Sequence, residues 1–591
     1  MKNFSTIREK LLSSEKRLVV KGIHPKGKIS KRSSVLRIAL GFPNTYEVGM
    51  SNLGFQTIYR LFNQMNQVVC ERFFLSYGSR GFDFPLYEGT RTLESNHNIK
   101  DFDLIAFSIP FELDYPHALK LLKFSGIPLL SSQRRADTPL IIAGGVAPTL
   151  NPEILAPFFD CLFMGEAEDM LAEFTEQCFQ LYLRKTPKEE ALFQFSKIKG
   201  VYVPRFYKIS YHEDGSVKEI NVAEGVPSVV QRRSVNLKGV ETFSPITSPH
   251  AHFKNSLLIE VGRGCAHGCR FCATGFIYQP CRFYKKESIL SQVEKYAKDS
   301  KSAVSTRHVG LIGSLISDHP KLEDICEALY LEGFEIGTSS LRVDSLSPKL
   351  LKILVDSGMK TLTVAPEVGT KKMWKVINKK IDREAVLKSA ELASEAFIPN
   401  LKLYFIIGLP FEGEEDIDGI VDLVHEVHRI FIKDYRLNKA RKRRKSGKRR
   451  LRLSINPFIP KPHTPFQWCG MDGEKELKRK LNIIACGVKD LRGVHFERKS
   501  IRQAILQGIF SLGNRKVGEG LFYVIEENLS FRQAWKKVGV DPNSIVFEPK
   551  KLNSSLPWDI IDCGVSKSFL IKEFEKAKRV AAEWEKQDVR P

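Results

Sequence analysis

Three cysteines, Cys265, Cys269 and Cys272, lie within eight residues of one another in the segment EVGRGCAHGCRFCATG. Their spacing is C-x3-C-x2-C, and the segment directly follows the apolar run LLIEVG, which is typical of a buried strand. Thiolates are soft ligands that suit iron–sulfur clusters, zinc or copper(I). Three ligands on one short loop favour a four-iron cluster, because one iron then stays free for an exogenous ligand. The spacing therefore predicts a metal site at the end of a strand.

A structural zinc site is the alternative interpretation of the same loop. His267 lies inside it, and Cys281 follows nine residues after Cys272, so a fourth ligand is available. Structural zinc sites are tetrahedral and normally take four protein ligands. The remaining cysteines are scattered along the chain, and we expect them to behave as small buried hydrophobes.

The elements that must position this loop form a series of strands and helices. Six apolar runs alternate with helical stretches and predict a partial parallel barrel, the chemistry of which belongs at the carboxyl ends of the strands. The runs are 257–262, 308–314, 335–342, 361–367, 401–410 and 451–460.

An earlier strand–helix series predicts a second, doubly wound parallel sheet. Its strands are expected at 35–42, 103–110, 139–146 and 160–165. Such sheets bind ligands at the carboxyl ends of their strands, where turns such as Gly144-Gly145 let a backbone approach closely.

A chain of 591 residues is too long for one core, so we predict an α/β protein of several domains. An N-terminal extension covers 1–34, a Rossmann-like sheet domain 35–180, a connector 181–250, the barrel 251–468 and a mainly helical region 469–591. The connector should contain a hairpin that turns at Asp214-Gly215. No apolar run approaches the roughly 20 residues of a membrane span, and we find no apolar signal stretch near residue 1. We therefore expect a soluble, cytoplasmic protein.

The charge balance favours acidic partners. The chain has 91 Lys and Arg against 68 Asp and Glu, which gives a formal charge of +23. Its most basic stretch is 433–452, KDYRLNKARKRRKSGKRRLR. Such an excess favours binding to polyanions, RNA above all. A solvated basic loop without any partner is the other interpretation.

With Phe271 before its last cysteine, the loop motif resembles the signature of the radical SAM superfamily. The resemblance implies that Cys265, Cys269 and Cys272 hold a [4Fe–4S] cluster, the open iron of which chelates S-adenosylmethionine (SAM). One electron, from a donor such as flavodoxin or ferredoxin, then cleaves SAM to a 5′-deoxyadenosyl radical. That radical removes a hydrogen atom from a substrate that the sequence does not identify.

The resemblance also implies SAM-binding positions near later strand ends. Phe271 would lie on the adenine side, Arg342 would pair with the carboxylate and Glu367 would bond the ribose hydroxyls. The remaining positions are Gly313 and Ser314 at the methionine amino group, and Gly408, Pro410 and Asn456 beside adenine.

Residues 35–470 resemble the branch of this superfamily that carries a cobalamin-binding (B12-binding-like) domain, and nearly the whole chain resembles a functionally uncharacterised bacterial subgroup. The matching loops contain Ser108, Gly144, Gly145, Gly165 and Glu166. Many cobalamin domains carry a D-x-H-x-x-G loop with a cobalt-ligating histidine, whereas the equivalent stretch here, GFPNTYEVGMSNLGFQ, has none. Cobalamin binding, and any methyl transfer that depends on it, is therefore left open.

Three functions remain after this comparison. We favour a radical SAM enzyme acting on a small molecule, lipid or peptide. Radical modification of RNA or of a ribosomal component is the first alternative, and a non-catalytic sensor is the second. A methylthiotransferase proper would need an N-terminal cysteine triad, which Cys70 and Cys161 do not supply.

Overall fold

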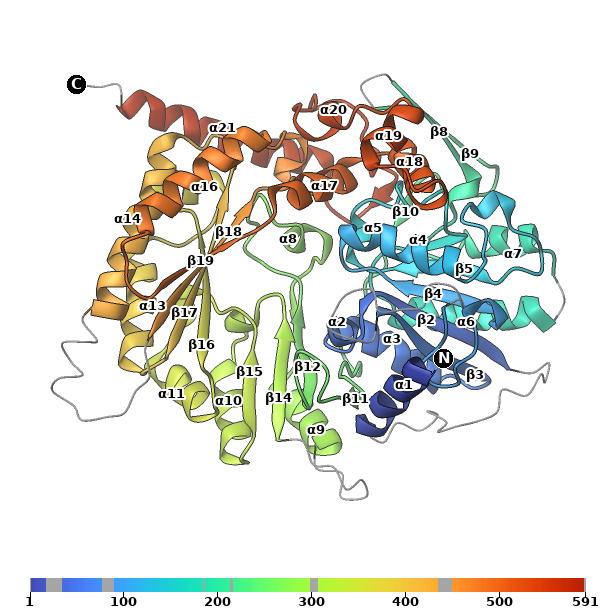
Figure 1. The fold of residues 1–591 in the computed structure, drawn as a ribbon, viewed down its shortest axis with the longest axis horizontal. Coiled ribbons are helices and arrows are strands. Elements are labelled where there is room, and N and C mark those ends of the chain that lie inside the picture. Colours follow the sequence, from blue (N-terminus) through green and yellow to red (C-terminus); the bar gives the residue numbers. More distant parts are fainter. Residues whose placement is uncertain are drawn as a thin grey trace.

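The structure is a computed structural model that describes residues 2–17, 35–76, 90–183, 186–212, 216–297, 307–433 and 449–588. Two groups of strands stand side by side in Figure 1, one from the N-terminal part of the chain and one from its middle. The C-terminal helices lie across the same end of both groups, while α8 (Thr274–Ile277) lies between the groups. The fold is therefore α/β, as predicted.

The N-terminal part forms a six-stranded sheet in the order β3-β2-β4-β5-β6-β7. Its strands are β2 (Leu36–Thr45), β3 (Val68–Ser76), β4 (Leu104–Ser108), β5 (Leu140–Gly144), β6 (Cys161–Phe163) and β7 (Val201–Tyr202). The first five in spatial order are parallel, and β7 runs antiparallel to β6. The strand order reverses between β2 and β4, and such a switch point is where doubly wound sheets bind ligands.

Helices cover both faces of this sheet. Ile105 and Ile141 pack with Leu119 of α4 (Tyr115–Phe124) on one face. Neighbouring residues of the same strands, such as Ile142, pack on the other face with Phe55 of α3 (Leu53–Gln64) and with α6 (Glu168–Leu183). Alternate residues of each strand thus enter different cores, as the period of two requires.

The middle of the chain forms two four-stranded sheets. The first has the order β13-β12-β14-β15, and the second β16-β17-β18-β19. Their strands are β12 (Ser256–Arg263), β13 (Arg282–Phe283), β14 (His308–Gly313), β15 (Glu335–Thr338), β16 (Thr361–Glu367), β17 (Asn400–Ile407), β18 (Arg450–Pro457) and β19 (Val494–Arg498).

All six strands expected for the barrel are present, and each is parallel to its neighbours from that set. The wall is not one continuous ladder among the described residues, because β15 and β16 belong to different sheets. Beyond the end of β15, the Leu341 amide donates to the Thr363 carbonyl at 3.1 Å and bridges the two sheets. The sequence did not predict β13 or β19.

Helices connect and cover these strands. They are α9 (Lys286–Ala297), α10 (Leu322–Leu331), α11 (Pro348–Asp356), α12 (Lys371–Val376), α13 (Arg383–Glu395), α14 (Glu414–His428) and α16 (Glu474–Val488). Their apolar faces share one large core with the strands of both sheets.

The C-terminal helices bridge the two parts of the molecule. They are α17 (Ile501–Leu512), α18 (Arg515–Glu526), α19 (Phe531–Lys537), α20 (Pro542–Val546) and α21 (Lys567–Asp588). Phe510 and Trp535 share the core of the first sheet, whereas Ala577 of α21 packs into the barrel core. The mainly helical region therefore has no separate core, and the domain boundaries stay predictions.

The connector contains the expected hairpin, in which β8 (Tyr207–Tyr211) pairs antiparallel with β9 (Val217–Val222). The turn at Asp214-Gly215 lies outside the described residues. Within the described ranges, we find no helix with the length and apolarity that a membrane span needs.

Candidate functional site: a cysteine loop beside an interdomain pocket

The three cysteines lie on a loop at the carboxyl end of β12, which we call the cysteine loop (residues 264–281). Gly264 begins it with φ = 81°, and a Cβ at this position would collide with the carbonyl oxygen of Tyr278. The loop then forms α8 and returns as β13, antiparallel to β12. Cys265, Cys269 and Cys272 are all half-buried on this loop. The glycine therefore closes the loop on itself and brings its two ends together.

Neighbouring elements hold the cysteine loop in place. The Asn378 side chain donates to the Gly268 carbonyl at 3.0 Å, just beyond α12. The Arg270 amide donates to the Ile377 carbonyl at 2.9 Å, and the Arg270 guanidinium pairs with Glu573 of α21 at 3.0 Å. The loop is thus fixed by the barrel and by the last helix.

The three thiols lie close enough to affect one another's pKa. Burial raises the pKa of Cys265, and the ionised form of Cys272 raises it further. Burial raises the pKa of Cys269 to about 12, although Lys379 opposes that rise. Ionised thiols repel one another and so raise one another's pKa, and a metal centre between them stabilises the ionised forms.

The donor set fits a cluster better than a single ion. Among the described residues, no group of three or more His, Cys, Asp or Glu side chains could hold one metal ion. In a four-iron cluster each thiolate binds a different iron, so the sulfur atoms need not converge on one point. The Nε2 atom of His267 lies 2.5 Å from the Asp318 carboxylate, so this ring nitrogen already has a partner. The three thiolates therefore suit the three protein-bound irons of such a cluster.

Two residues predicted to bind SAM lie within electrostatic reach of the cysteines. Arg342, just after β15, pairs with Asp344 at 2.6 Å and interacts with Cys269. Glu367 ends β16 at φ = 68°, accepts from Lys379 at 2.9 Å and interacts with Cys269. A non-glycine residue held at positive φ stores local strain, which often accompanies a functional position.

The other predicted SAM residues are more dispersed. Gly313 and Ser314 line the pocket described below. Phe271 packs against the barrel core, and Asn456 lies in β18 opposite Ile406.

The last two residues predicted to bind SAM, Gly408 and Pro410, follow the end of β17. The Gly408 amide donates to Glu412 at 2.7 Å. Pro410 lines a different pocket with Trp468. The structure does not bring these two residues into the pocket beside the cysteine loop, and their role stays a prediction.

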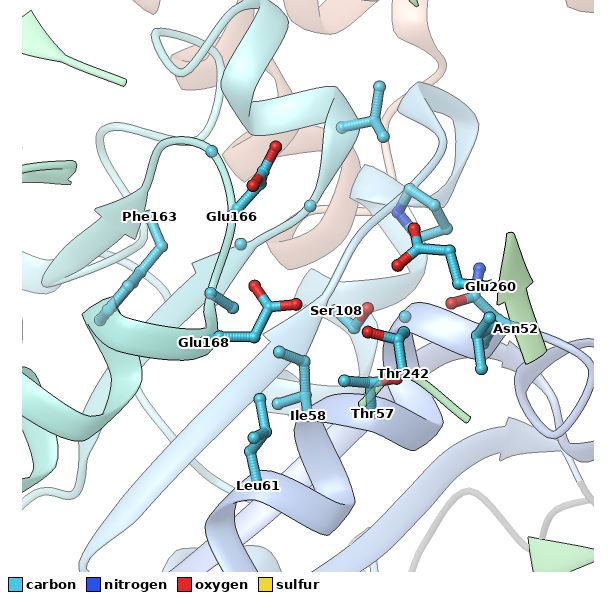
Figure 2. Close-up of a pocket in the computed structure, with 18 of the residues that line it drawn as sticks. Asn52, Thr57, Ile58, Leu61, Ser108, Phe163, Glu166, Glu168, Thr242 and Glu260 are labelled. Atoms are coloured by element: carbon cyan, nitrogen blue, oxygen red, sulfur yellow. The ribbon is translucent and has the colours of Figure 1, made fainter. Parts of the chain in front are cut away.

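A cavity of about 590 Å³ opens between the first sheet and the barrel. It is lined at the carboxyl ends of β4, β5 and β6 and by Leu40 of β2, so it lies at the switch point of the sheet. Figure 2 shows residues that line it. The cavity brings together all five residues predicted from the cobalamin-like loops, namely Ser108, Gly144, Gly145, Gly165 and Glu166. Gly262 and Gly264 line it from the barrel side, so the cavity reaches the start of the cysteine loop.

The sequence did not predict the wall of the cavity that α3 forms. Gly54, Thr57, Ile58 and Leu61 of α3 line it together, and Figure 2 shows the last three on one side of the helix. Their spacing of i, i+3, i+4 and i+7 places them on one face. The spacing was visible in the sequence, but a covering helix of the sheet shows the same pattern.

Glu166 is the centre of an ion-pair network rather than an open loop residue. Its carboxylate accepts two hydrogen bonds from Arg282, one from Arg263 at 3.3 Å and one from the Val235 amide at 2.8 Å. Burial would raise the pKa of Glu166, but the hydrogen bonds from Arg282 and the charge of Arg263 lower it below its usual value. Arg263 also pairs with Glu168. Arg263 precedes the cysteine loop and Arg282 follows it, so Glu166 ties both ends of the loop to the first sheet.

The pocket supplies no histidine for cobalt. The stretch expected to carry that residue forms the end of β2 and α2 (Tyr46–Gly49). No histidine stands among the lining residues that the structure describes. A bound cobalamin would therefore lack a histidine ligand from this wall. Of the basic stretch 433–452, on which the RNA prediction rests, residues 434–448 lie outside the described residues.

Comparison with protein families decides the assignment. A model of the radical SAM superfamily matches residues 259–424, and a model of the N-terminal region of radical SAM proteins matches residues 54–204. The chain belongs to the radical SAM superfamily. The first match includes the cysteine loop and the second most of the sheet side of the pocket. The cofactors of this family, a [4Fe–4S] cluster and SAM, are those that the sequence predicted.

Individual relatives extend the likeness over most of the chain. An uncharacterized protein of Methanocaldococcus jannaschii is 27% identical over 491 residues, which cover 83% of this chain and 91% of the relative. The ribosomal protein uS12 methylthiotransferase RimO of Clostridioides difficile is 24% identical over 177 residues, or 29% of this chain and 40% of RimO.

Solved structures show a remote likeness. The cobalamin-dependent SAM radical enzyme OxsB aligns with a TM-score of 0.47 at 15% identity, over 98% of this chain and 87% of OxsB. The radical SAM methyltransferase TsrM from Kitasatospora setae aligns with a TM-score of 0.44 at 13% identity, over 66% of this chain and 71% of TsrM. At this distance neither structure assigns a substrate or a corrinoid to this chain.

Proposed function

We propose that this radical SAM protein is an enzyme that reductively cleaves SAM at a [4Fe–4S] cluster held by Cys265, Cys269 and Cys272. The observation that supports it is the placement of three half-buried thiols on one pre-positioned loop at a strand end, inside the segment that matches the family. When bound, the cluster supplies the electron that breaks the sulfur–C5′ bond of SAM, which yields methionine and a 5′-deoxyadenosyl radical.

The protein's own residues would bind and orient the reactants. Asn378 and Arg270 hold the loop rigid, so the thiols need little rearrangement on binding the cluster. Arg342 and Glu367 lie within electrostatic reach of Cys269, where a guanidinium suits the SAM carboxylate and a carboxylate suits the ribose hydroxyls. Both must exchange or share their present partners, Asp344 and Lys379, when SAM binds.

The substrate we propose is a small molecule, and the supporting observation is the cavity of about 590 Å³ next to the cysteine loop. Cavities of roughly 300–1,000 Å³ are typical of small-molecule sites. A one-electron donor such as flavodoxin or ferredoxin would reduce the cluster.

The test is removal of each thiol in turn. Cys265→Ala, Cys269→Ala and Cys272→Ala should each lose most iron after anaerobic reconstitution and form no 5′-deoxyadenosine with SAM and dithionite. The matched control is Cys486→Ala, an exposed cysteine of α16, which should keep both. Retained SAM cleavage in any of the three loop variants would refute the proposal.

A further inference from the structure

The wall of the cavity formed by α3 contains a buried hydroxyl group without a partner. Thr57 is 4% exposed and lines the cavity, yet its Oγ1 atom has no hydrogen-bond partner among the described residues. A threonine inside a helix usually satisfies its hydroxyl with the carbonyl four residues earlier. Leaving a buried hydroxyl unpaired is costly. A ligand in the cavity could complete this hydrogen bond, because Thr57 lines it.

The charged groups of the cavity, by contrast, are already paired with one another. The charged side chains that line it are Glu166, Glu168, Glu260 and Arg263. Arg263 pairs with all three carboxylates, and Arg282 adds two hydrogen bonds to Glu166. A charged ligand would have to break these pairs before it gained a partner of its own. The electrostatics therefore favour an uncharged ligand.

The remaining lining on the sheet side is mostly apolar. Ile58 and Leu61 of α3 face the cavity together with Ile142 and Met170. These side chains favour a hydrocarbon-rich ligand, because apolar area removed from water is the main source of binding free energy.

We propose that this cavity binds an uncharged, largely apolar small molecule that hydrogen-bonds to the Thr57 hydroxyl. If the proposed SAM cleavage holds, this molecule is the substrate, since the cavity reaches Gly264 and Gly313 beside the cysteine loop. No residue of the α3 wall is assigned to SAM.

A matched pair of fluorescent probes tests the ligand class. N-phenylnaphthylamine is uncharged, and anilinonaphthalene sulfonate has the same aromatic skeleton with a sulfonate. The reconstituted full chain should bind the uncharged probe saturably and bind the anionic probe at least about tenfold more weakly. The measurement needs no reductant, so it stays informative even if SAM cleavage fails. Equal affinity for the two probes, or no saturable binding, would overturn the proposal.

Substitutions then locate the probe. Thr57→Val keeps the shape but removes the unpaired hydroxyl, so it should raise the melting temperature of the ligand-free protein and weaken probe binding roughly 2- to 10-fold. A merely structural hydroxyl would instead give a lower melting temperature. Leu61→Trp should abolish binding by filling the cavity, whereas Gln64→Ala, at the exposed end of α3, should not change it.

Two results from these variants would contradict the proposal. Probe affinity that Leu61→Trp and Thr57→Val both leave unchanged would show that the probe binds elsewhere. Corrinoid that co-purifies with the wild-type chain, and is lost in Leu61→Trp, would show that cobalamin occupies the cavity.

Discussion

Replacing Glu166 by Gln should both destabilise the protein and loosen the cysteine loop. The Glu166 side chain is 3% exposed and carries the single negative charge shared by Arg263 and Arg282 at this point of the network. Gln keeps the size of the side chain but leaves three guanidinium groups, those of Arg263, Arg282 and the more distant Arg232 at 3.9 Å, short of a charged partner. Breaking a buried ion pair by removing one partner costs about 3–5 kcal/mol. Because Arg263 keeps Glu168 and Glu260, we expect the lower end, about 3 kcal/mol.

The assay is thermal unfolding, together with the iron content after anaerobic reconstitution. For a cooperative unit of about 150–250 residues, 3 kcal/mol lowers the melting temperature by roughly 6–12 °C. The control is Glu173→Gln, in helix α6, whose pair with Arg233 is exposed. Such a surface pair contributes about 1 kcal/mol or less. Iron content should fall in Glu166→Gln and not in Glu173→Gln, because Glu166 ties both ends of the loop to the sheet, whereas Glu173 pairs with Arg233 outside the loop.

The pH dependence of this effect follows from the lowered pKa of Glu166. A carboxyl group whose folded pKa is depressed stabilises the fold at every pH above its unfolded pKa, here 4.5. The difference in stability between wild type and Glu166→Gln should therefore be constant from about pH 6 upward and shrink progressively as pH falls from the unfolded pKa to the lower folded pKa. If Glu166→Gln melted and bound iron as Glu173→Gln does, the ion-pair network would not be what holds the loop.

Two further substitutions test the site itself. Cys281→Ala should keep full iron content and 5′-deoxyadenosine formation, because three thiols suffice for the proposed cluster; loss of both would make Cys281 a fourth ligand. Glu367→Gln should weaken SAM binding, measured by isothermal titration calorimetry, roughly tenfold or more through the loss of a charged hydrogen-bond acceptor. If SAM affinity were unchanged while the melting temperature fell, the pair of Glu367 with Lys379 would be purely structural.

Local sequence patterns determined most of the architecture. The strands β2, β4, β5 and β6 were predictable because a strand buried on both faces is a continuous apolar run. The strand β3 was missed because Glu71 and Arg72 interrupt its apolar pattern. Both side chains are buried, and Arg72 is paired with Glu15 and Glu94. The partners of a buried charge are distant in sequence, so no local pattern could reveal them.

The sequence by itself predicted the cluster ligands, because the spacing of Cys265, Cys269 and Cys272 on one loop is a local property. Only the tertiary structure decided what surrounds that loop. Glu166 meets Arg263 and Arg282 across 97 and 116 residues of chain. Thr57 faces the barrel only because β2 and β4 bring α3 to the switch point of the sheet. Contacts between such distant residues depend on packing, which is why the cysteine loop and the strand-end loops of the cavity could be predicted, whereas its α3 wall and its ion pairs could not.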